Sequence, residues 1–344
     1  MADRIALVTG ATGYIGGRLV DTLVAKGWQV RATGRRPRPE GLVSDAEYLP
    51  ADLAGEGDLT PLFHEVTHVF HLAGASSSKS SQAQMQRDNV VATERLLEAA
   101  AESETLERLL YMSSTSVYGE DFVLPSPVTE EFEPQPSRAY GKAKWATEQV
   151  LWAADRAGAP IVVVRPVSVF GPGNVKLLGS AVLDAAIERF AGHKVLPIAA
   201  DAIEQRLVHI DDVVRACLHL AVHPWSTGGA FNIVFPSYPS SHEVAGMIAG
   251  QLGMEVEPAP DADCGLSYDA RAKARDDMLA AGMRPDILLT KERFRFMRKA
   301  NPNNRLSIDS LLSTGFQFPG TDPADLEKAI VATIEWYRDQ GWIL

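Results

Sequence analysis

The chain has 344 residues, of which 46% are hydrophobic, 22% charged and 8% aromatic, an ordinary composition for a soluble protein. Its formal net charge of −11 argues against nucleic acid or an anionic membrane as the main partner. The two cysteines, Cys217 and Cys264, belong to no Cys-x-x-Cys pair, so we expect two structural thiols in a reducing compartment.

The N-terminus contains no charged stretch followed by a long apolar region. No apolar run approaches the ~18 residues that a membrane span needs. We therefore expect no signal peptide, no membrane partner and a cytoplasmic location.

The first half of the chain alternates short β-branched runs with longer amphipathic stretches. This alternation is typical of a parallel sheet with helices on both faces, that is, of an α/β Rossmann doubly wound fold. The apolar run 161–164 fits a strand buried on both sides. The predicted strands are 5–9, 29–33, 47–49, 68–72, 108–112 and 161–165, and the predicted helices are 18–26, 90–101 and 140–157.

After residue 170 the pattern loosens, and glycine and proline interrupt the chain at 171–173. We expect residues 1–170 to form the Rossmann dinucleotide-binding core. Residues 171–344 should form mainly a smaller C-terminal substrate-binding lobe, with about 205–235 returning to the core. The predicted elements of this half are helices over 177–191, 209–220, 242–252 and 325–338 and a short strand over 231–234, while the role of 258–304 stays open.

The sequence TGATGYIG, residues 9–16, stands where the first strand passes into the first helix. Gly10 permits the tight turn, Gly13 lets the backbone approach a pyrophosphate, and Gly16 allows the helix to pack closely on the strand. The free N–H groups at the helix start supply an anion site. The alternative is a glycine-rich turn without a ligand, but the order strand, loop, helix favours a dinucleotide.

The end of the second strand bears on the choice of cofactor. Arg35 and Arg36 follow it, and no carboxylate comes before Glu40. An acidic residue would hold the ribose of NAD, whereas two arginines fit the 2′-phosphate of NADP or are simply solvated. NADP is therefore favoured over NAD. Asp52, after the third strand, either accepts a hydrogen bond from the adenine amino group or is an exposed loop carboxylate.

Tyr140 and Lys144 are four residues apart in a predicted helix, so their side chains share one face. A tyrosine is a poor base at neutral pH, but a nearby ammonium and a nicotinamide cation would favour the phenolate and lower its pKa. Tyr140 then moves a proton to or from the reacting oxygen. The serine-rich run 113–119 follows the fifth strand, where a hydroxyl can orient that oxygen, although it also fits a plain turn.

With these motifs the chain resembles the extended short-chain dehydrogenase/reductases, the NAD-dependent epimerase/dehydratase superfamily. The resemblance runs through 71–74, 165–166, 170–173, 206–212, 231–233 and 335–338 as well. It implies that Ser114, Tyr140 and Lys144 are catalytic, and that no metal is needed. It implies cofactor contacts by Gly10, Thr12, Gly13, Tyr14, Ile15, Gly16, Arg35, Arg36, Asp52, Leu53, Leu72, Ala73, Gly74, Asn89, Tyr140, Lys144, Pro166 and Val167, and substrate contacts by Ser76, Thr115, Ser116, Ser168 and Arg206.

The same resemblance bears on the reaction. Sugar-nucleotide 4,6-dehydratases carry an acidic pair where this chain has Thr115 and Ser116, which argues against dehydration. Epimerases usually carry an asparagine where this chain has Ser168. Arg206 resembles the arginine that grips a nucleotide diphosphate, although a salt bridge would explain it equally well.

Two segments point away from epimerases. Residues 31–35 look like the second-strand end of NADP-dependent carbonyl reductases, and 289–297 look like a segment of hydroxysteroid-type members or a basic amphipathic lid helix. We expect an NAD(P)-dependent oxidoreductase that transfers hydride at a secondary alcohol or ketone. The alternatives are an NAD-dependent nucleotide-sugar epimerase that works by transient oxidation, and a cofactor-binding regulatory protein without turnover. We expect a small-molecule substrate and a homodimer.

Overall fold

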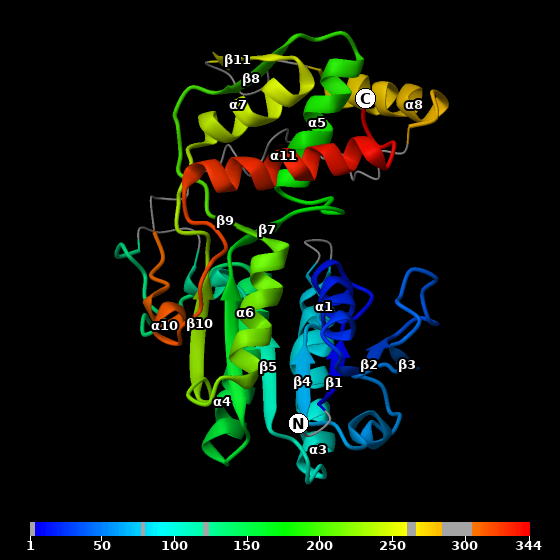
Figure 1. Ribbon diagram of the computed structural model, residues 1–344, viewed down its shortest axis with the longest axis vertical. Helices are drawn as coiled ribbons and strands as arrows, with labels where there is room; N and C mark the ends of the chain where they lie inside the picture. The colour runs from blue at the N-terminus through cyan, green and yellow to red at the C-terminus, as the bar shows by residue number, and fades with distance from the viewer. Residues whose placement is uncertain (1–3, 77–79, 120–123, 260–265, 284–304) are drawn as a thin grey trace.

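The computed structural model describes residues 4–76, 80–119, 124–259, 266–283 and 305–344. Within these residues, seven parallel strands form one sheet in the order β10-β6-β5-β4-β1-β2-β3 (Figure 1). The predicted α/β Rossmann fold is confirmed. The strands are β1 (Ile5–Thr9), β2 (Gln29–Gly34), β3 (Glu47–Pro50), β4 (His68–His71), β5 (Arg108–Met112), β6 (Ile161–Pro166) and β10 (Gly229–Ile233).

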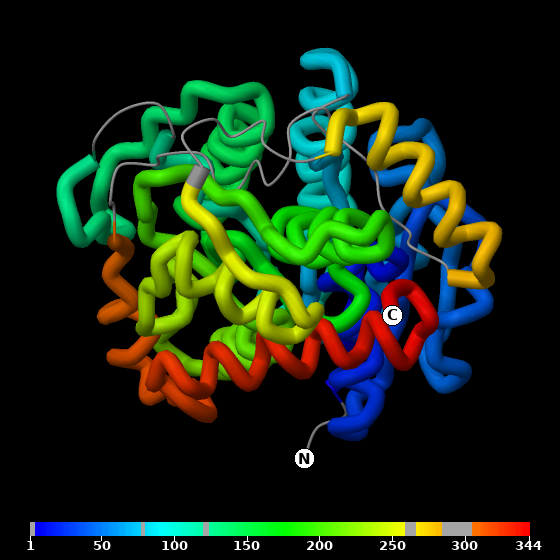
Figure 2. Tube along the Cα trace, turned by 90° about the horizontal axis from the view of Figure 1, so that it is seen from above, coloured from blue at the N-terminus to red at the C-terminus, as the bar shows by residue number. Residues whose placement is uncertain are grey.

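Helices cover both faces of this sheet. α1 (Tyr14–Ala25) packs beside α6 (Ile210–Val222) on one face, and α3 (Ala92–Ala101) packs beside α4 (Ala139–Arg156) on the other (Figures 1 and 2). All six residues of β6 are buried, as the run without polar alternation predicted. A short helix α2 (Gln82–Met85) and a π-helical turn (Gln86–Val91) lead into α3.

A smaller lobe lies over the carboxyl ends of the strands (Figure 1). It contains α5 (Leu178–Phe190), α7 (Ser241–Leu252), α8 (Tyr268–Ala280), α11 (Pro323–Asp339) and the parallel pair β8 (Val195–Ala199) and β11 (Glu255–Ala259). A second short pair, β7 (Ser168–Phe170) and β9 (Leu207–His209), joins it to the core, and α10 (Asp309–Ser313) lies near β10. None of the described helices is long and apolar enough to cross a membrane.

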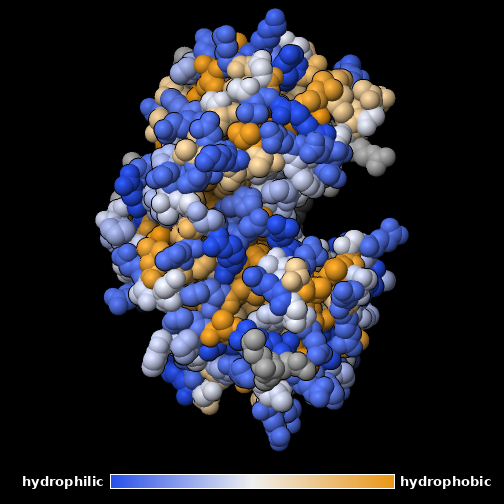
Figure 3. Space-filling model, viewed as in Figure 1, coloured by the Kyte–Doolittle hydropathy of each residue, from blue (hydrophilic) through white to orange (hydrophobic). Residues whose placement is uncertain are grey.

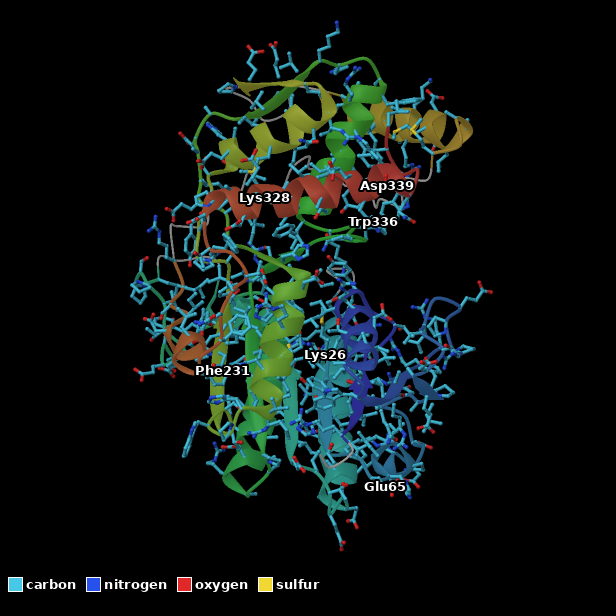
Figure 4. All side chains as sticks on the ribbon, viewed as in Figure 1. Lys26, Glu65, Phe231, Lys328, Trp336 and Asp339 are labelled. Carbon is cyan, nitrogen blue, oxygen red and sulfur yellow. The ribbon has the colours of Figure 1, made fainter. Side chains whose placement is uncertain are left out.

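The closing helix α11 fixes the loop that follows β7. The Tyr337 hydroxyl donates a hydrogen bond to the Asn174 carbonyl oxygen in the interior. The neighbouring Trp336, labelled in Figure 4, lies beside Gly173, where a Cβ would be 3.7 Å from its ring. Through α11, the smaller lobe therefore holds the backbone of the 171–174 loop in place against the Rossmann core.

Most predicted elements are found, with shifted ends. α1 begins at Tyr14 rather than at residue 18. Its first turn contains Gly16 and Gly17, which are poor helix formers, so the sequence pattern did not indicate this turn. The pairs β7–β9 and β8–β11 and the helices α8 and α10 were not predicted. Cys217 is a buried free thiol, whereas Cys264 and the segment 289–297 lie outside the described residues.

Candidate active site

The glycine-rich loop between β1 and α1 packs so closely on neighbouring backbone that side chains at Gly10 and Gly16 would collide with it. Gly10 has a φ of +67°, which L side chains rarely adopt, and a Cβ there would lie 2.8 Å from the Ala73 amide nitrogen. A Cβ at Gly16 would collide with the Gly10 carbonyl oxygen. α1 starts after Gly13 without a side-chain cap or an acidic residue in its first turn, so its first N–H groups can donate hydrogen bonds to an anion.

A cleft of about 480 Å³ leads from this loop toward α4. Figure 3 shows the surface hollowed between the two lobes, above α1 and the carboxyl ends of β2 and β3. Doubly wound sheets bind their ligands at this edge. Most of the predicted cofactor residues line the cleft, namely Gly10, Thr12, Gly13, Tyr14, Ile15, Gly16, Arg35, Asp52, Leu53, Leu72, Ala73, Gly74, Tyr140 and Lys144, and the predicted substrate residue Ser76 lines it too.

Other lining residues were missed by sequence reasoning. Asp88 comes from the π-helical turn before α3, and Lys176 comes from the loop held by α11. No sequence motif marks either residue, because each reaches the cleft only through packing of distant segments. The full set of missed lining residues is Thr33, Gly34, Ala51, Ala54, Asp88, Ala92, Met112, Gly173, Asn174, Val175 and Lys176.

Two arginines and two aspartates form a chain of ion pairs at the end of the cleft near β2 and β3. Arg35 Nη1 lies 3.1 Å from Asp88 Oδ2. Arg87 lies 2.7 Å from Asp88 Oδ1 and 2.5 Å from Asp52 Oδ2. Burial alone would raise the pKa of Asp52, but hydrogen bonds from Arg87 and from the Ala54 amide lower that pKa overall. Asp52 is therefore ionised at neutral pH.

The two arginines after β2 differ in position. Arg35 lines the cleft, whereas Arg36 does not. The Arg36 side chain is exposed, and its carbonyl oxygen accepts a hydrogen bond of 2.6 Å from Tyr48. Of the pair, Arg35 is the one within reach of a ligand in this cleft.

Tyr140 and Lys144 share one face of α4, as their spacing predicted. The Lys144 ammonium lies 5.9 Å from the centre of the Tyr140 ring. The Ser114 side chain, from the loop after β5, interacts with the Tyr140 hydroxyl and acts to lower its pKa. Ser114 Oγ in turn lies 2.7 Å from Ser116 Oγ and accepts a hydrogen bond from the Ser116 amide. The structure thus brings the three predicted catalytic residues together.

Burial shifts both titrating groups of this set. It raises the pKa of Tyr140 to about 12, and the opposing effect of the Ser114 side chain offsets only part of that rise. It lowers the pKa of Lys144 to about 8, against the opposing effect of the Glu148 carboxylate. The sequence led us to expect that a nearby ammonium and a nicotinamide cation lower the pKa of Tyr140, but within the chain burial outweighs the lowering effect of Ser114. At neutral pH Tyr140 is a phenol and so a proton donor.

The Lys144 ammonium is 5% exposed and donates a hydrogen bond of 2.7 Å to the Met112 carbonyl oxygen. Gly74 lies beside it, because a Cβ there would be 3.8 Å from the ammonium and would collide with Asn89 Oδ1. This Asn89 oxygen is buried and has no hydrogen-bond partner among the described residues. Asn89, predicted as a cofactor residue, therefore lies behind Gly74 and not on the cleft wall.

A buried ion pair lies behind the predicted catalytic residues. Glu148, one turn after Lys144, accepts hydrogen bonds of 2.6 and 3.1 Å from Arg165 of β6, and the two side chains are 0% and 3% exposed. Ser113 donates to the same carboxylate. Arg165 also donates a 2.8 Å hydrogen bond to the Tyr118 hydroxyl. The pair ties α4 to β6 and to the loop that carries Ser114.

His71 holds the end of β4 in a similar way. Its ring nitrogens lie 2.7 Å from Thr9 Oγ1 and 2.9 Å from Thr93 Oγ1, and the side chain is fully buried. Burial, together with the nearby Lys144 charge, lowers the pKa of His71 to about 3, so the ring is neutral. Thr9 also accepts a hydrogen bond of 3.1 Å from the Ala73 amide. This network fixes the strand end that lines the cleft.

The remaining predicted residues are not part of the cleft lining, although Ser114 and Ser116 lie behind Tyr140, which does line the cleft. Thr115 donates a hydrogen bond of 3.4 Å to the Pro166 carbonyl oxygen. Ser168 pairs with Leu207 across β7 and β9, which places it next to Arg206. The described residues contain no group of three or more His, Cys, Asp or Glu that could hold a metal ion. The predicted residues outside the lining are Arg36, Asn89, Ser114, Thr115, Ser116, Pro166, Val167, Ser168 and Arg206.

Comparison with known proteins then gives the family. Residues 6–233 match the model of the NAD dependent epimerase/dehydratase family, a stretch that contains the glycine-rich loop and all three predicted catalytic residues. The chain belongs to this family.

Its relatives carry more than one activity in their names. UDP-glucose 4-epimerase of Mycolicibacterium smegmatis is 31% identical over 266 residues, 73% of this chain and 84% of that protein. Tetraketide alpha-pyrone reductase 2 of Arabidopsis thaliana is 31% identical over 245 residues, 64% and 75% of the two chains. Two other curated relatives are matched over only 52% of their own length.

Among solved structures, MoeE5 in complex with UDP-glucose and NAD superposes with a TM-score of 0.70 at 27% identity, covering 97% of this chain and 98% of that one. The named relatives include a reductase and an epimerase. The family therefore supports an enzyme, but it does not distinguish between these two reactions.

Proposed function

We propose that this protein is an NAD(P)-dependent oxidoreductase that interconverts a ketone and a secondary alcohol, with Tyr140 as the general acid and base. The observation that carries the proposal is that α4 brings Tyr140 and Lys144 to one side of the cleft that begins at the glycine-rich loop, with Ser114 close enough to Tyr140 to lower its pKa. Two hydroxyl groups, those of Tyr140 and Ser114, are therefore present there. The ammonium of the buried Lys144 lies 5.9 Å from the centre of the Tyr140 ring.

The residues of the cleft fit a nicotinamide dinucleotide. Gly10 and Gly16 allow the loop after β1 to pack closely on its backbone neighbours, and the start of α1 offers N–H groups to a diphosphate. Arg35 and Lys176 add positive charge to the cleft wall. A bound nicotinamide would supply or accept the hydride. Lys144 would hold its ribose from the α4 side.

The chain's own residues would move the proton. In reduction, Tyr140 Oη gives its proton to the carbonyl oxygen of the substrate, while Ser114 Oγ hydrogen-bonds the same oxygen and orients it. Lys144 stabilises the phenolate that remains, because an ammonium nearby favours the charged form. Tyr140 then regains a proton from solvent. The protonated state of Tyr140 at neutral pH suits the reductive direction.

Arg35 supports NADP as the preferred cofactor, with NAD as the alternative. A guanidinium on the cleft wall can pair with a 2′-phosphate. The last residue of β2 is Gly34, so no carboxylate stands at the strand end to hold the ribose hydroxyls of NAD.

A nucleotide-sugar epimerase is the second candidate. Arg206 precedes β9 and lies next to Ser168, at the base of the second lobe, where it could meet a diphosphate. One relative is named as a UDP-glucose 4-epimerase. In such an enzyme Tyr140 would take a proton and later return it. A 4,6-dehydratase is disfavoured, because Thr115 and Ser116 cannot act as acids or bases near neutral pH.

We also propose which part of the chain binds the dinucleotide and which part binds the substrate. Residues 1–170, with about 205–235, would bind the dinucleotide, and the rest of 171–344 would bind a small-molecule substrate. The pairing of β10 with β6 supports the return of 205–235 to the core. We also expect a cytoplasmic location and a homodimer. Analytical ultracentrifugation of the purified protein would test the oligomeric state.

The experiment that tests the reaction follows nicotinamide absorbance during turnover. The protein is incubated with NADPH and a panel of ketones, and separately with NAD and UDP-glucose. A reductase consumes one NADPH for each alcohol formed. Conversion of the sugar nucleotide with unchanged absorbance, and no oxidation of NADPH by any ketone, would replace the reductase by the epimerase.

A further inference from the structure

We infer that Asp88 limits how strongly the cleft prefers NADP over NAD, because it neutralises the arginine that a 2′-phosphate would use. The inference deepens the cofactor part of the proposed function and rests on it. Asp88 is not part of any motif, and its role follows from the packing of the π-helical turn against β2 and β3.

The carboxylate is placed to act on Arg35. Asp88 Oδ2 lies 3.1 Å from Arg35 Nη1, and both residues line the cleft. The Arg35 side chain is 60% exposed and open to a ligand, whereas Asp88 is 8% exposed. In the part of the chain that the structure describes, Asp88 is the one carboxylate within ion-pair distance of Arg35.

Asp88 is also held in this position. Its second oxygen lies 2.7 Å from Arg87, which in turn pairs with Asp52 at 2.5 Å. The π-helical turn Gln86–Val91 buries three successive residues, Asp88, Asn89 and Val90. π turns often occur at functional sites. The wider turn directs Asp88 to the cleft while Asn89 packs behind Gly74.

The charges of this cluster cancel. Arg35 and Arg87 carry two positive charges, and Asp52 and Asp88 carry two negative ones. The 2′-phosphate of NADP, with a charge near −2, therefore meets a neutral group of side chains instead of a cationic one. The ribose hydroxyls of NAD carry no charge and are insensitive to this balance. Asp88 thus weakens NADP binding selectively.

The test is a comparison of NADP and NAD dissociation constants by equilibrium titration, without turnover. The variants are Asp88→Asn, which keeps the shape and one acceptor, and Asp88→Glu, which keeps the charge. Glu94→Gln, an exposed position on α3, removes the same charge from elsewhere on the surface. We expect Asp88→Asn to shift the affinity ratio toward NADP by about fivefold or more. The two other variants should change the ratio by less than about twofold.

A double variant shows whether the effect passes through Arg35. In a chain that already carries Arg35→Ala, the added substitution Asp88→Asn should give little gain in NADP affinity. No Arg35 guanidinium is then left for the loss of the Asp88 charge to free. An unchanged ratio in Asp88→Asn, or a shift toward NAD, would overturn the inference, the latter showing that Asp88 positions Arg35 for the phosphate. If the wild type binds neither dinucleotide, the proposed function itself fails, which is a different result.

Discussion

The ammonium of Lys144 lies 5.9 Å from the centre of the Tyr140 ring, one turn further along α4. Burial raises the pKa of Tyr140 to about 12 and lowers that of Lys144 to about 8. Below pH 8 the site therefore holds a phenol beside a cation. This charge state suits proton donation to a carbonyl oxygen, because the cation stabilises the phenolate that remains.

The first prediction concerns pH. Since the pKa of Lys144 is lowered, its charge is lost as pH rises through about 8, well below the range of an ordinary lysine. We expect kcat/KM for reduction to fall through that interval, and Lys144→Met to be slow at every pH and to lack the inflection. Lys144→Arg should keep its charge and lack the inflection too. Steady-state rates from about pH 6 to about pH 10 check this, and a flat wild-type profile would contradict it.

The second prediction separates the two arginines after β2. Arg35→Ala should weaken NADP binding by about tenfold, because a charge-assisted contact with the phosphate is lost. Arg36→Ala should have a much smaller effect, since Arg36 does not line the cleft. NAD binding should change little in either variant. Titrations at moderate salt measure all three effects, and tighter binding of NAD than NADP by the wild type would refute the NADP assignment.

The third prediction concerns stability in mild acid. The pKa of His71 is lowered to about 3 in the folded chain, whereas an unfolded histidine titrates near 6.5. Because the folded state favours the neutral ring, the associated stability is fully present above about pH 6.5 and is lost as pH falls toward 3. At pH 5 the loss is roughly 2 kcal/mol relative to pH 7. Burial and the Arg4 charge also lower the pKa of His68, to about 4, and add to the effect in the same direction.

Urea unfolding at the two pH values measures this loss. His71→Asn should be less stable at neutral pH but should show a smaller difference between the two conditions. If the free energy of unfolding changes equally between the two pH values in wild type and variant, His71 is not the group responsible for the loss.

The fourth prediction concerns the buried pair behind the site. Glu148→Gln leaves the Arg165 charge without its partner and should lower the free energy of unfolding by about 3–5 kcal/mol. Glu148→Met/Arg165→Met removes both charges and should recover much of that loss. Its kcat should stay low, because Ser113 has lost its acceptor and the Ser114 loop its anchor. A double variant with normal kcat would show that the pair serves stability alone.

Local patterns predicted the parts of this molecule that depend on neighbouring residues in the chain. The bounds of β1 and β5 were predicted as found, and the spacing of Tyr140 and Lys144 gave their shared face. The glycine-rich loop follows from the same local logic, since a tight turn at Gly10 needs a positive φ.

The remainder depends on distant contacts. Asp88 and Lys176 reach the cleft through packing of separate segments, and burial, which no motif encodes, sets the pKa values of Tyr140 and Lys144. The strand pairs β7–β9 and β8–β11 join segments far apart in the chain, and a local pattern does not encode such pairing. Arg36 was predicted with Arg35, yet only one of two adjacent side chains lines the cleft.

The role of Tyr140 is tested most directly by single-turnover hydride transfer in Tyr140→Phe. The ring still packs on α4, but no proton can move from it, so the loss should fall on the chemical step. The enzyme is mixed with NADPH and a ketone that the wild type reduces, and the decay of nicotinamide absorbance is followed in one turnover. The account predicts a rate lowered by about a hundredfold or more with NADPH affinity nearly unchanged. A variant that transfers hydride at the wild-type rate would contradict it.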